Sequence, residues 1–284
     1  MITSVSKYLE WVHKSHSLEG PYKDCFCNIN HVYYRGHAST SWKLEPSLFR
    51  TGEKRHDEHW MLRKANNMLW QELCDCNSDL DKMIRLQHYG LHTRLLDVTF
   101  NPLIALFFAC QEVKNPDDEQ DGIVSCGYTD ENNVKVCYAI AEYVFNYETL
   151  KINERNLLKI CKKYDVRLEE LESVHFLSAP FNNPRISIQN GAFLMSPIKQ
   201  EGEKLPVTAE CGYIRNRMEK VFSKQCVIPH NFKHILLDEL DYLGFNKATI
   251  YADMTNKLQY INEKEDKEWE TIDLDLSAAS INNY

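Results

Sequence analysis

Three arginines are the side chains of this sequence best suited to binding an anion: Arg35, Arg94 and Arg185. Each is expected at or near a strand end, where side chains commonly reach a cleft. A planar guanidinium donates two parallel hydrogen bonds, which suits phosphate and carboxylate groups. If the three side chains converge, they form an anion pocket. A second interpretation stays open for Arg94, because it could instead form a buried pair with Asp97 that fixes a loop.

Four aromatic residues near these arginines could provide faces for a ring: Tyr34, Tyr89, Phe107 and Phe193. An anion pocket lined by aromatic rings favours a nucleotide-like ligand.

His88 and His92 are four residues apart, a spacing that would place both on one face of a continuous helix. Gly90 lies between them and interrupts such a helix, so we predict no metal site here. His88 could act as a general base, although a hydrogen-bonded core role is the favoured interpretation. The sequence has no glycine-rich phosphate loop, nucleophile elbow or His-Glu-x-x-His motif.

The element that must position these side chains is an apolar helix expected over residues 102–110. Asn101 can accept a hydrogen bond at the N-cap, and Pro102 suits the first helical position. A helix that is apolar on all sides belongs in the core. Several polar residues precede it, and burying them unpaired would be costly. They are Gln87, His88, His92, Arg94, Asp97 and Thr99.

The other expected elements alternate without an internal repeat or a linker. Helices are expected over 4–16, 56–76, 79–88, 143–164, 168–173, 232–243 and 254–261. Strands are expected over 30–36, 93–98, 122–128, 134–141, 174–177, 186–189, 192–195, 226–228 and 249–251. This order predicts a single α+β domain with a mixed or antiparallel sheet around a buried central helix. Its parts are a motif-bearing core at about 28–197, a loop at 198–210, a strand and helix part at about 211–262, and an acidic tail at about 263–284.

Composition narrows the function. The net charge of −8 over 284 residues argues against non-specific nucleic-acid binding, which needs a basic surface. No stretch has the length of a membrane span, and the N-terminus lacks an apolar signal segment. The ten cysteines are therefore expected as free thiols of a cytoplasmic protein. The closest pairs, Cys25 with Cys27 and Cys74 with Cys76, lack the usual zinc spacing, so no metal is expected.

Three blocks of the sequence resemble the FRG domain family, which is named for a Phe-Arg-Gly triplet. The triplet is Tyr34-Arg35-Gly36 here. The densest block runs from Gln87-His88-Tyr89-Gly90 through Thr93-Arg94-Leu95-Leu96-Asp97 to Asn101-Pro102. A third block contains Pro184-Arg185 and Gln189-Asn190-Gly191-Ala192-Phe193.

The same blocks are more distantly similar to ADP-ribosyltransferases, which implies a fold of that type and a pocket for NAD. In this resemblance Arg35 holds the NAD phosphates, and Asp97-Val98-Thr99 occupies the place of the motif that orders the pocket. The third motif normally carries a catalytic glutamate, but this chain has Gln189 there. The expected catalytic residues are Arg35, His88, Asp97 and Gln189. The expected ligand-binding residues are Tyr34, Gly36, Tyr89, Thr93, Arg94, Thr99, Arg185 and Phe193.

Three functions remain open. The resemblance implies an NAD-binding effector of microbial defence or toxin systems, with NAD as substrate and a protein as a partner or target. The second is a ligand sensor or protein-interaction module without catalysis. The third is a hydrolase or nuclease that uses His88 and Asp97, although the absence of clustered carboxylates argues against a metal nuclease.

Overall fold

The computed structural model describes residues 1–16, 31–50, 58–113, 119–129, 133–146, 154–178, 184–198, 211–251 and 256–262. Nearly all of the expected loop over 198–210 and the acidic tail lie outside these residues. Among them, no helix is both long enough and apolar enough to cross a membrane.

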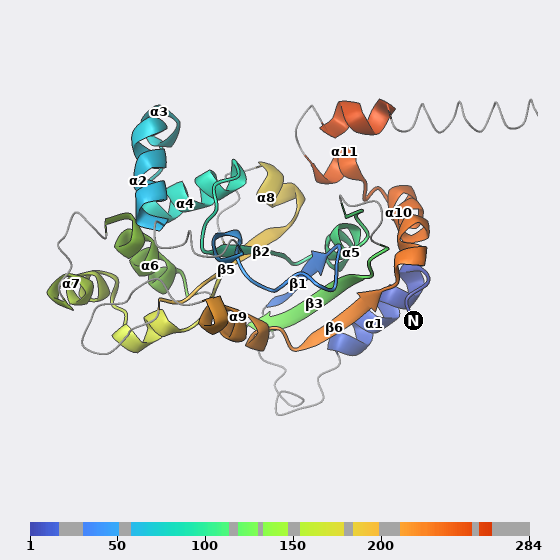
Figure 1. Cartoon of the computed structure of the whole chain (residues 1–284), viewed down its shortest axis with the longest axis horizontal. Coiled ribbons are helices and arrows are strands. Elements are labelled where there is room, and N and C mark those ends of the chain that lie inside the picture. The colour runs from blue at the N-terminus through green and yellow to red at the C-terminus, as the bar shows by residue number, and fades with distance from the viewer. Residues whose placement is uncertain are drawn as a thin grey trace, which may run out of the picture.

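One six-stranded sheet organises the fold, and every neighbouring pair of strands in it is antiparallel. The strand order is β4-β5-β2-β1-β3-β6 (Figure 1). The strands are β1 (His31–His37), β2 (Leu95–Thr99), β3 (Gly122–Thr129), β4 (His175–Leu177), β5 (Gly191–Met195) and β6 (Lys224–Ile228). This architecture confirms the expected α+β class and the antiparallel sheet.

The sheet is nearly divided between β1 and β2. Strand β1 pairs with β3 along its whole length, from His31↔Thr129 to His37↔Ile123. It pairs with β2 at a single register position, Tyr34↔Thr99. The two strands therefore separate beyond that position, which leaves room for side chains between the two halves of the sheet.

Helix α5 (Pro102–Ala109) lies directly on the sheet. The Asn101 side chain accepts a hydrogen bond from the Leu103 amide at 2.9 Å, as the sequence predicted. A Cβ added to Gly36 would lie 1.8 Å from the Ala105 carbonyl oxygen, so only glycine lets the backbones approach this closely. The expected buried central helix is thereby confirmed.

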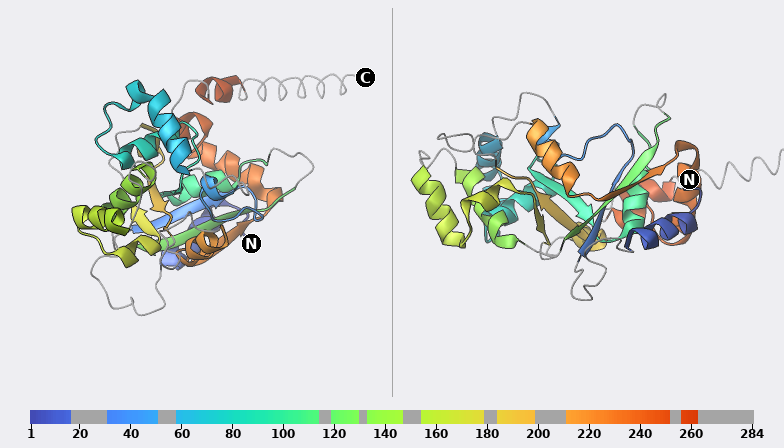
Figure 2. Two further views of the ribbon diagram at one scale, coloured as in Figure 1. Left: turned by 60° about the vertical axis from the view of Figure 1, so that its left-hand side comes forward. Right: turned by 90° about the horizontal axis from the view of Figure 1, so that it is seen from below.

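The sheet face that carries Tyr34 is covered at one end by three helices in addition to α5. They are α1 (Val5–His16), α10 (Lys233–Tyr242) and α11 (Lys247–Ile250), and their apolar residues share one cluster with Tyr34 and Val124. The other end is covered by α2 (Glu58–Met68), α3 (Trp70–Leu73), α4 (Asp79–His88), α6 (Val134–Asn146), α7 (Glu154–Tyr164) and the 3₁₀ helix η3 (Leu168–Glu172). Figures 1 and 2 show these two groups of helices at opposite ends of the molecule.

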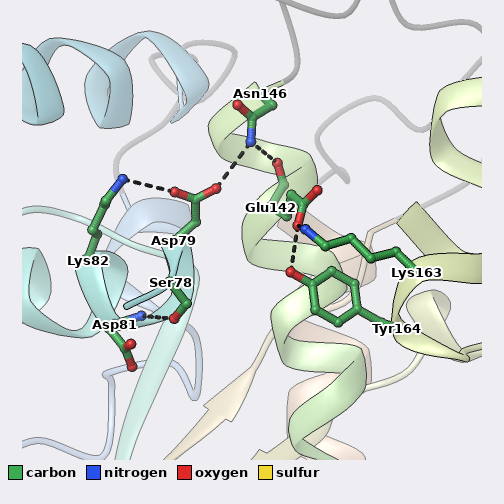
Figure 3. Close-up of polar contacts among 8 residues, drawn as sticks. All are labelled: Ser78, Asp79, Asp81, Lys82, Glu142, Asn146, Lys163 and Tyr164. Carbon is green, nitrogen blue, oxygen red and sulfur yellow. Dashed lines mark hydrogen bonds and ion pairs between the residues drawn. The ribbon is translucent and has the colours of Figure 1, made fainter. Parts of the chain in front are cut away.

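Polar contacts join α4, α6 and α7 at that second end (Figure 3). Asn146 on α6 donates to Asp79 on α4 at 3.1 Å. Glu142 on α6 accepts from Lys163 and from Tyr164, the last residue of α7. These contacts fix α4, whose C-terminal end carries Gln87 and His88.

The opposite face is covered by α9 (Cys211–Lys220) and the 3₁₀ helix η1 (Ser47–Phe49). Tyr33 and Leu96 pack there with Phe49, Ile214 and Met218. Successive strand residues point to opposite faces, so Tyr33 and Tyr34 belong to different cores. Two further short helices are η4 (His230–Phe232) and α8 (Pro184–Ile188). Residues 256–262 are helical too, in agreement with the helix expected over 254–261.

Several sequence expectations are wrong. Residues 134–141 and 186–189 were expected as strands but belong to helices α6 and α8, and the strand over 249–251 is replaced by α11. The buried residues of α6, which include Val136, Ile140 and Val144, are at helical spacing, but the alternation at the start of the segment suggested a strand. The helix over 56–76 is divided into α2 and α3, and α9 was not expected.

Candidate functional site

A pocket of about 360 Å³ lies where β1 and β2 separate. Its walls come from the end of β1, the end of β2, the C-terminal end of α4, helix α5, and the segment around α8. The sequence expected twelve site residues, and eight of them line this pocket. Those eight are Tyr34, Arg35, Gly36, His88, Asp97, Thr99, Gln189 and Phe193.

Arg35 spans the gap between the separating strands. Its Nη1 donates to the backbone oxygen of Asp97 on β2, and its Nε donates to His37 Nε2 at 2.8 Å. Among the described residues, Nη2 has no acceptor. The guanidinium is surrounded by protein although part of the side chain faces the pocket. This burial lowers the Arg35 pKa to about 10, which leaves the group charged at neutral pH.

Two further residues of this wall, His37 and Arg50, were not expected from the sequence. Burial, together with the neighbouring charges of Arg35 and Arg50, lowers the His37 pKa to about 2. Burial also lowers the Arg50 pKa. The position of His37 two residues after Arg35 on β1 was the available signal, because alternate strand residues share a face. Nothing local in the sequence indicated that Arg50 joins this wall.

The carboxylates that interact electrostatically with Arg35 and Arg50, those of Asp97 and Glu45, have other hydrogen-bond partners. Glu45 forms an ion pair with Arg215, with 3.2 Å between Oε2 and Nη2. Among the described residues, the Arg50 side chain binds the Glu45 backbone oxygen alone, at 3.1 Å. Asp97 Oδ1 accepts from the Gln87 amide at 2.8 Å. Within the described part of the chain, neither Arg35 nor Arg50 forms an ion pair with a carboxylate.

A chain of hydrogen bonds between side chains positions Asp97 in the β2 wall of the pocket. The Thr93 hydroxyl donates to Gln87 Oε1, and the Gln87 amide in turn holds Asp97. Thr93 does not line the pocket, and it is connected to the site by its hydrogen bond to Gln87. Asp97 Oδ2 has no hydrogen-bond partner among the described residues, so it is available to a ligand.

Thr99 and Gln189 close the end of the pocket. The Thr99 hydroxyl donates to the Gln189 backbone oxygen at 2.7 Å and accepts from the Asn101 amide at 3.0 Å. The Gln189 side-chain amide donates to the Ile250 oxygen at 3.3 Å. Thr99 thus ties β2 to the segment before β5 and to the start of α5.

Arg94 is placed differently from the expectation. It does not line the pocket, and it is buried against Glu58, with 2.9 Å between Arg94 Nε and Glu58 Oε1. Its Nη1 also donates to the backbone oxygens of Ser196 and Pro197. The alternative pairing of Arg94 with Asp97 is wrong, and both expectations are replaced by a structural role for Arg94.

Two other expected residues are separate from the pocket. Tyr89 is 78% exposed and does not line it. Arg185 is in α8, but its side chain lies outside the described residues. The aromatic lining is supplied by Tyr34, Phe108, Phe193 and Trp42. The Trp42 indole lies edge-on to His37, with 6.3 Å between ring centroids. No group of three or more His, Cys, Asp or Glu that could hold a metal ion occurs in the described segments.

The model of the FRG domain family matches residues 30–118. This segment includes β1, β2, α4 and α5, and therefore most of the pocket wall. No curated protein and no solved structure matches the chain.

Proposed function

Residues 30–118 form an FRG domain, and on this premise we propose that the pocket between β1 and β2 binds a nucleotide of the NAD type. The proposed activity resembles that of ADP-ribosyltransferases: cleavage of the glycosidic bond with transfer or hydrolysis. In this proposal the protein is an effector of a microbial defence or toxin system.

The observation that carries the proposal is the pair Arg35 and Arg50 in one pocket, without a carboxylate partner among the described residues. Arg50 is exposed, but the Arg35 guanidinium is surrounded by protein, and removing such a charge from water without an ion pair is costly. The two cations also repel each other. A bound anion offsets both costs, and the planar guanidinium suits phosphate oxygens. Arg35 is already oriented by His37 and by the Asp97 backbone, which lowers the entropy cost of binding.

The remaining walls suit the other parts of a nucleotide. Asp97 and Gln189 provide polar groups for ribose hydroxyls, and Phe108 and Phe193 provide apolar faces for a ring. Ligand pockets commonly enclose about 300–1,000 Å³. A pocket of about 360 Å³ is near the lower limit. It suits one half of a dinucleotide, such as the nicotinamide ribose with its phosphate, while the other half extends out of the pocket.

The proposed reaction breaks the bond between ribose C1′ and the nicotinamide nitrogen. Nicotinamide leaves with the bonding electrons, and an oxygen of water or of an acceptor adds to C1′ and loses its proton. Positive charge develops on the ribose during this step. The Asp97 carboxylate is the group we propose to stabilise that charge, because Gln189 is neutral. Glu112 also lines the pocket and is a second carboxylate available for this role.

The test is thermal unfolding with and without millimolar NAD, with free nicotinamide measured in the same tubes. Arg50→Ala is the main variant because Arg50 makes one backbone hydrogen bond, so its loss should leave the fold intact. Arg217→Ala on the surface of α9 is the matched control. A ligand at about 100 times its Kd stabilises the native state by about 2.7 kcal/mol, or several degrees in Tm. We expect this shift in the wild type and in Arg217→Ala, and not in Arg50→Ala.

Released nicotinamide in the wild type would establish the enzymatic part of the proposal. If NAD neither raises the Tm of the wild type nor is cleaved to free nicotinamide, the proposed function is overturned. A shift without nicotinamide would favour a second function, a ligand sensor without catalysis. One observation favours that alternative: the residue at the expected glutamate position is Gln189, whose amide is already bonded to the Ile250 oxygen.

A further inference from the structure

His37 is a buried imidazole in the pocket wall. It is 4% exposed and lies two residues after Arg35 on β1. Its Nε2 receives the Arg35 Nε–H at 2.8 Å. An arginine N–H can only donate, so Nε2 must carry a lone pair and the ring proton must be on Nδ1. Arg35 therefore fixes the tautomer of His37.

The Nδ1–H of His37 has no acceptor among the described residues. The Nδ1 atom is nevertheless not fully buried. Among the described residues, His37 Nδ1 is not one of the fully buried side-chain nitrogens or oxygens without a hydrogen-bond partner. The Nδ1 atom consequently keeps some exposed surface, and His37 is one of the residues that line the pocket.

The charges around His37 keep its ring neutral. Arg35 approaches from β1 and Arg50 from the end of η1, and both disfavour the protonated imidazole, as does burial. The other ionisable groups that line the pocket are Tyr34, His88, Asp97 and Glu112. His37 can therefore donate to a ligand oxygen without adding a third positive charge.

We propose that Arg35, His37 and Arg50 form a phosphate subsite in which His37 donates a hydrogen bond from Nδ1 to a phosphate oxygen. This inference rests on the nucleotide-binding function proposed above and specifies how its phosphate is bound. A carboxylate has two oxygens, and one guanidinium can bind both of them. A phosphate group has additional oxygens, so it can use both arginines and the neutral imidazole donor together.

Two substitutions separate donation to the ligand from mere positioning of Arg35. In His37→Gln the side-chain oxygen takes the place of Nε2 and still accepts from Arg35, but the donor at the Nδ1 position is lost. In His37→Asn the amide nitrogen takes the place of Nδ1, and the acceptor for Arg35 is lost. The probes are NAD and inorganic pyrophosphate, with affinities measured by calorimetry and the fold of each variant checked by thermal unfolding.

We expect His37→Gln to weaken the binding of both probes by roughly tenfold or more, because a hydrogen bond to a charged group is lost. His37→Asn should keep more of the affinity than His37→Gln. The reverse order, or wild-type affinity in His37→Gln, would overturn the phosphate subsite and leave the proposed function intact. Binding of pyrophosphate that depends on His37, without binding of NAD, would support the subsite and overturn the proposed function. Failure of the wild type to bind either probe would overturn both.

A measurement on the wild-type chain does not depend on the folding of the variants. Nitrogen-15 NMR of the histidine side chains reports which ring nitrogen carries the proton. We expect His37 in the Nδ1-protonated form, with an Nδ1 signal that moves when pyrophosphate is added. An Nε2-protonated ring, or an Nδ1 signal that does not move at saturating pyrophosphate, would overturn the inference.

Discussion

Arg94 and Glu58 form a two-pronged ion pair inside the protein, with side chains that are 2% and 1% exposed. The pair joins the start of α2 to the residue before β2, and Arg94 also holds the backbone after β5 through Ser196 and Pro197. It therefore links the helices at one end of the molecule to the sheet that carries Asp97.

Glu58→Ala is expected to destabilise the protein by about 3–5 kcal/mol, because it leaves the Arg94 charge buried and unpaired. Chemical denaturation measures this loss. The exposed pair Lys135–Asp165 supplies the control, and Lys135→Ala should cost no more than about 1 kcal/mol. The double variant Glu58→Leu, Arg94→Met should be more stable than Glu58→Ala. If Glu58→Ala and Lys135→Ala lower the free energy of unfolding equally, Arg94 and Glu58 do not form a buried structural pair.

Arg35→Ala and Arg50→Ala should differ in stability but share the loss of ligand binding. Arg35→Ala removes the donors to the Asp97 oxygen and to His37, so we expect a cost of about 1–3 kcal/mol. Arg50→Ala should change the free energy of unfolding by about 1 kcal/mol or less, because only its bond to Glu45 is lost. Denaturation curves and NAD titrations on the same samples test both statements. A stable Arg35→Ala variant with unchanged NAD affinity would show that Arg35 neither joins the strands nor binds the ligand.

Gly36→Ala should prevent α5 from packing on β1. The added Cβ would meet the Ala105 oxygen at 1.8 Å, a backbone atom that cannot move without displacing the helix. We expect a loss of roughly 3 kcal/mol or more, at the upper limit for overpacking. Gly191→Ala is the control, because its Cβ would meet the Ile186 side chain at 3.3 Å. Thermal unfolding that gives both variants the same Tm would refute the close contact between α5 and β1.

The cysteines should react with alkylating reagents in an order set by burial. Burial raises the pKa of Cys110 and of Cys137 to about 12, whereas Cys74 is exposed. The thiolate is the reactive form, so at pH 8 the two buried thiols present almost none of it. Peptide mapping after brief iodoacetamide treatment should find Cys74 labelled and Cys110 and Cys137 unlabelled. All three should react after denaturation, and early labelling of Cys110 would indicate that α5 opens in the native protein.

Elements that depend on local hydrogen bonds were predicted accurately from the sequence. Helix α4 was expected over 79–88 and is observed as Asp79–His88. Ser78 caps its first turn by accepting from the Asp81 amide at 3.0 Å, and Gly90, at a φ of 96°, ends it. A cap and a left-handed glycine act within a few residues, so their effect is present in the sequence itself.

Helix α6 shows where local patterns are insufficient. The run Val134-Lys135-Val136-Cys137 alternates as a strand does, but the segment packs as a helix that contacts α4, α7 and the sheet. The buried residues Val136, Ile140 and Val144 are at helical spacing, but the alternation and the β-branched residues at the start of the segment favoured a strand. Burial against other elements decided the outcome.

By itself, the sequence determined the α+β class, the Asn101–Pro102 start of the buried helix, the match of residues 30–118 to the FRG domain, and the place of Arg35 beside Gly36 on a strand. Only the tertiary structure decided which partners the charged residues have. Arg94 pairs with Glu58, 36 positions away, and Arg50 reaches the pocket that Arg35 and His37 line. The physical reason is that charge pairing depends on which groups are brought together during burial. A periodicity or a capping pattern within a short stretch of chain carries no information about partners that are dozens of residues away.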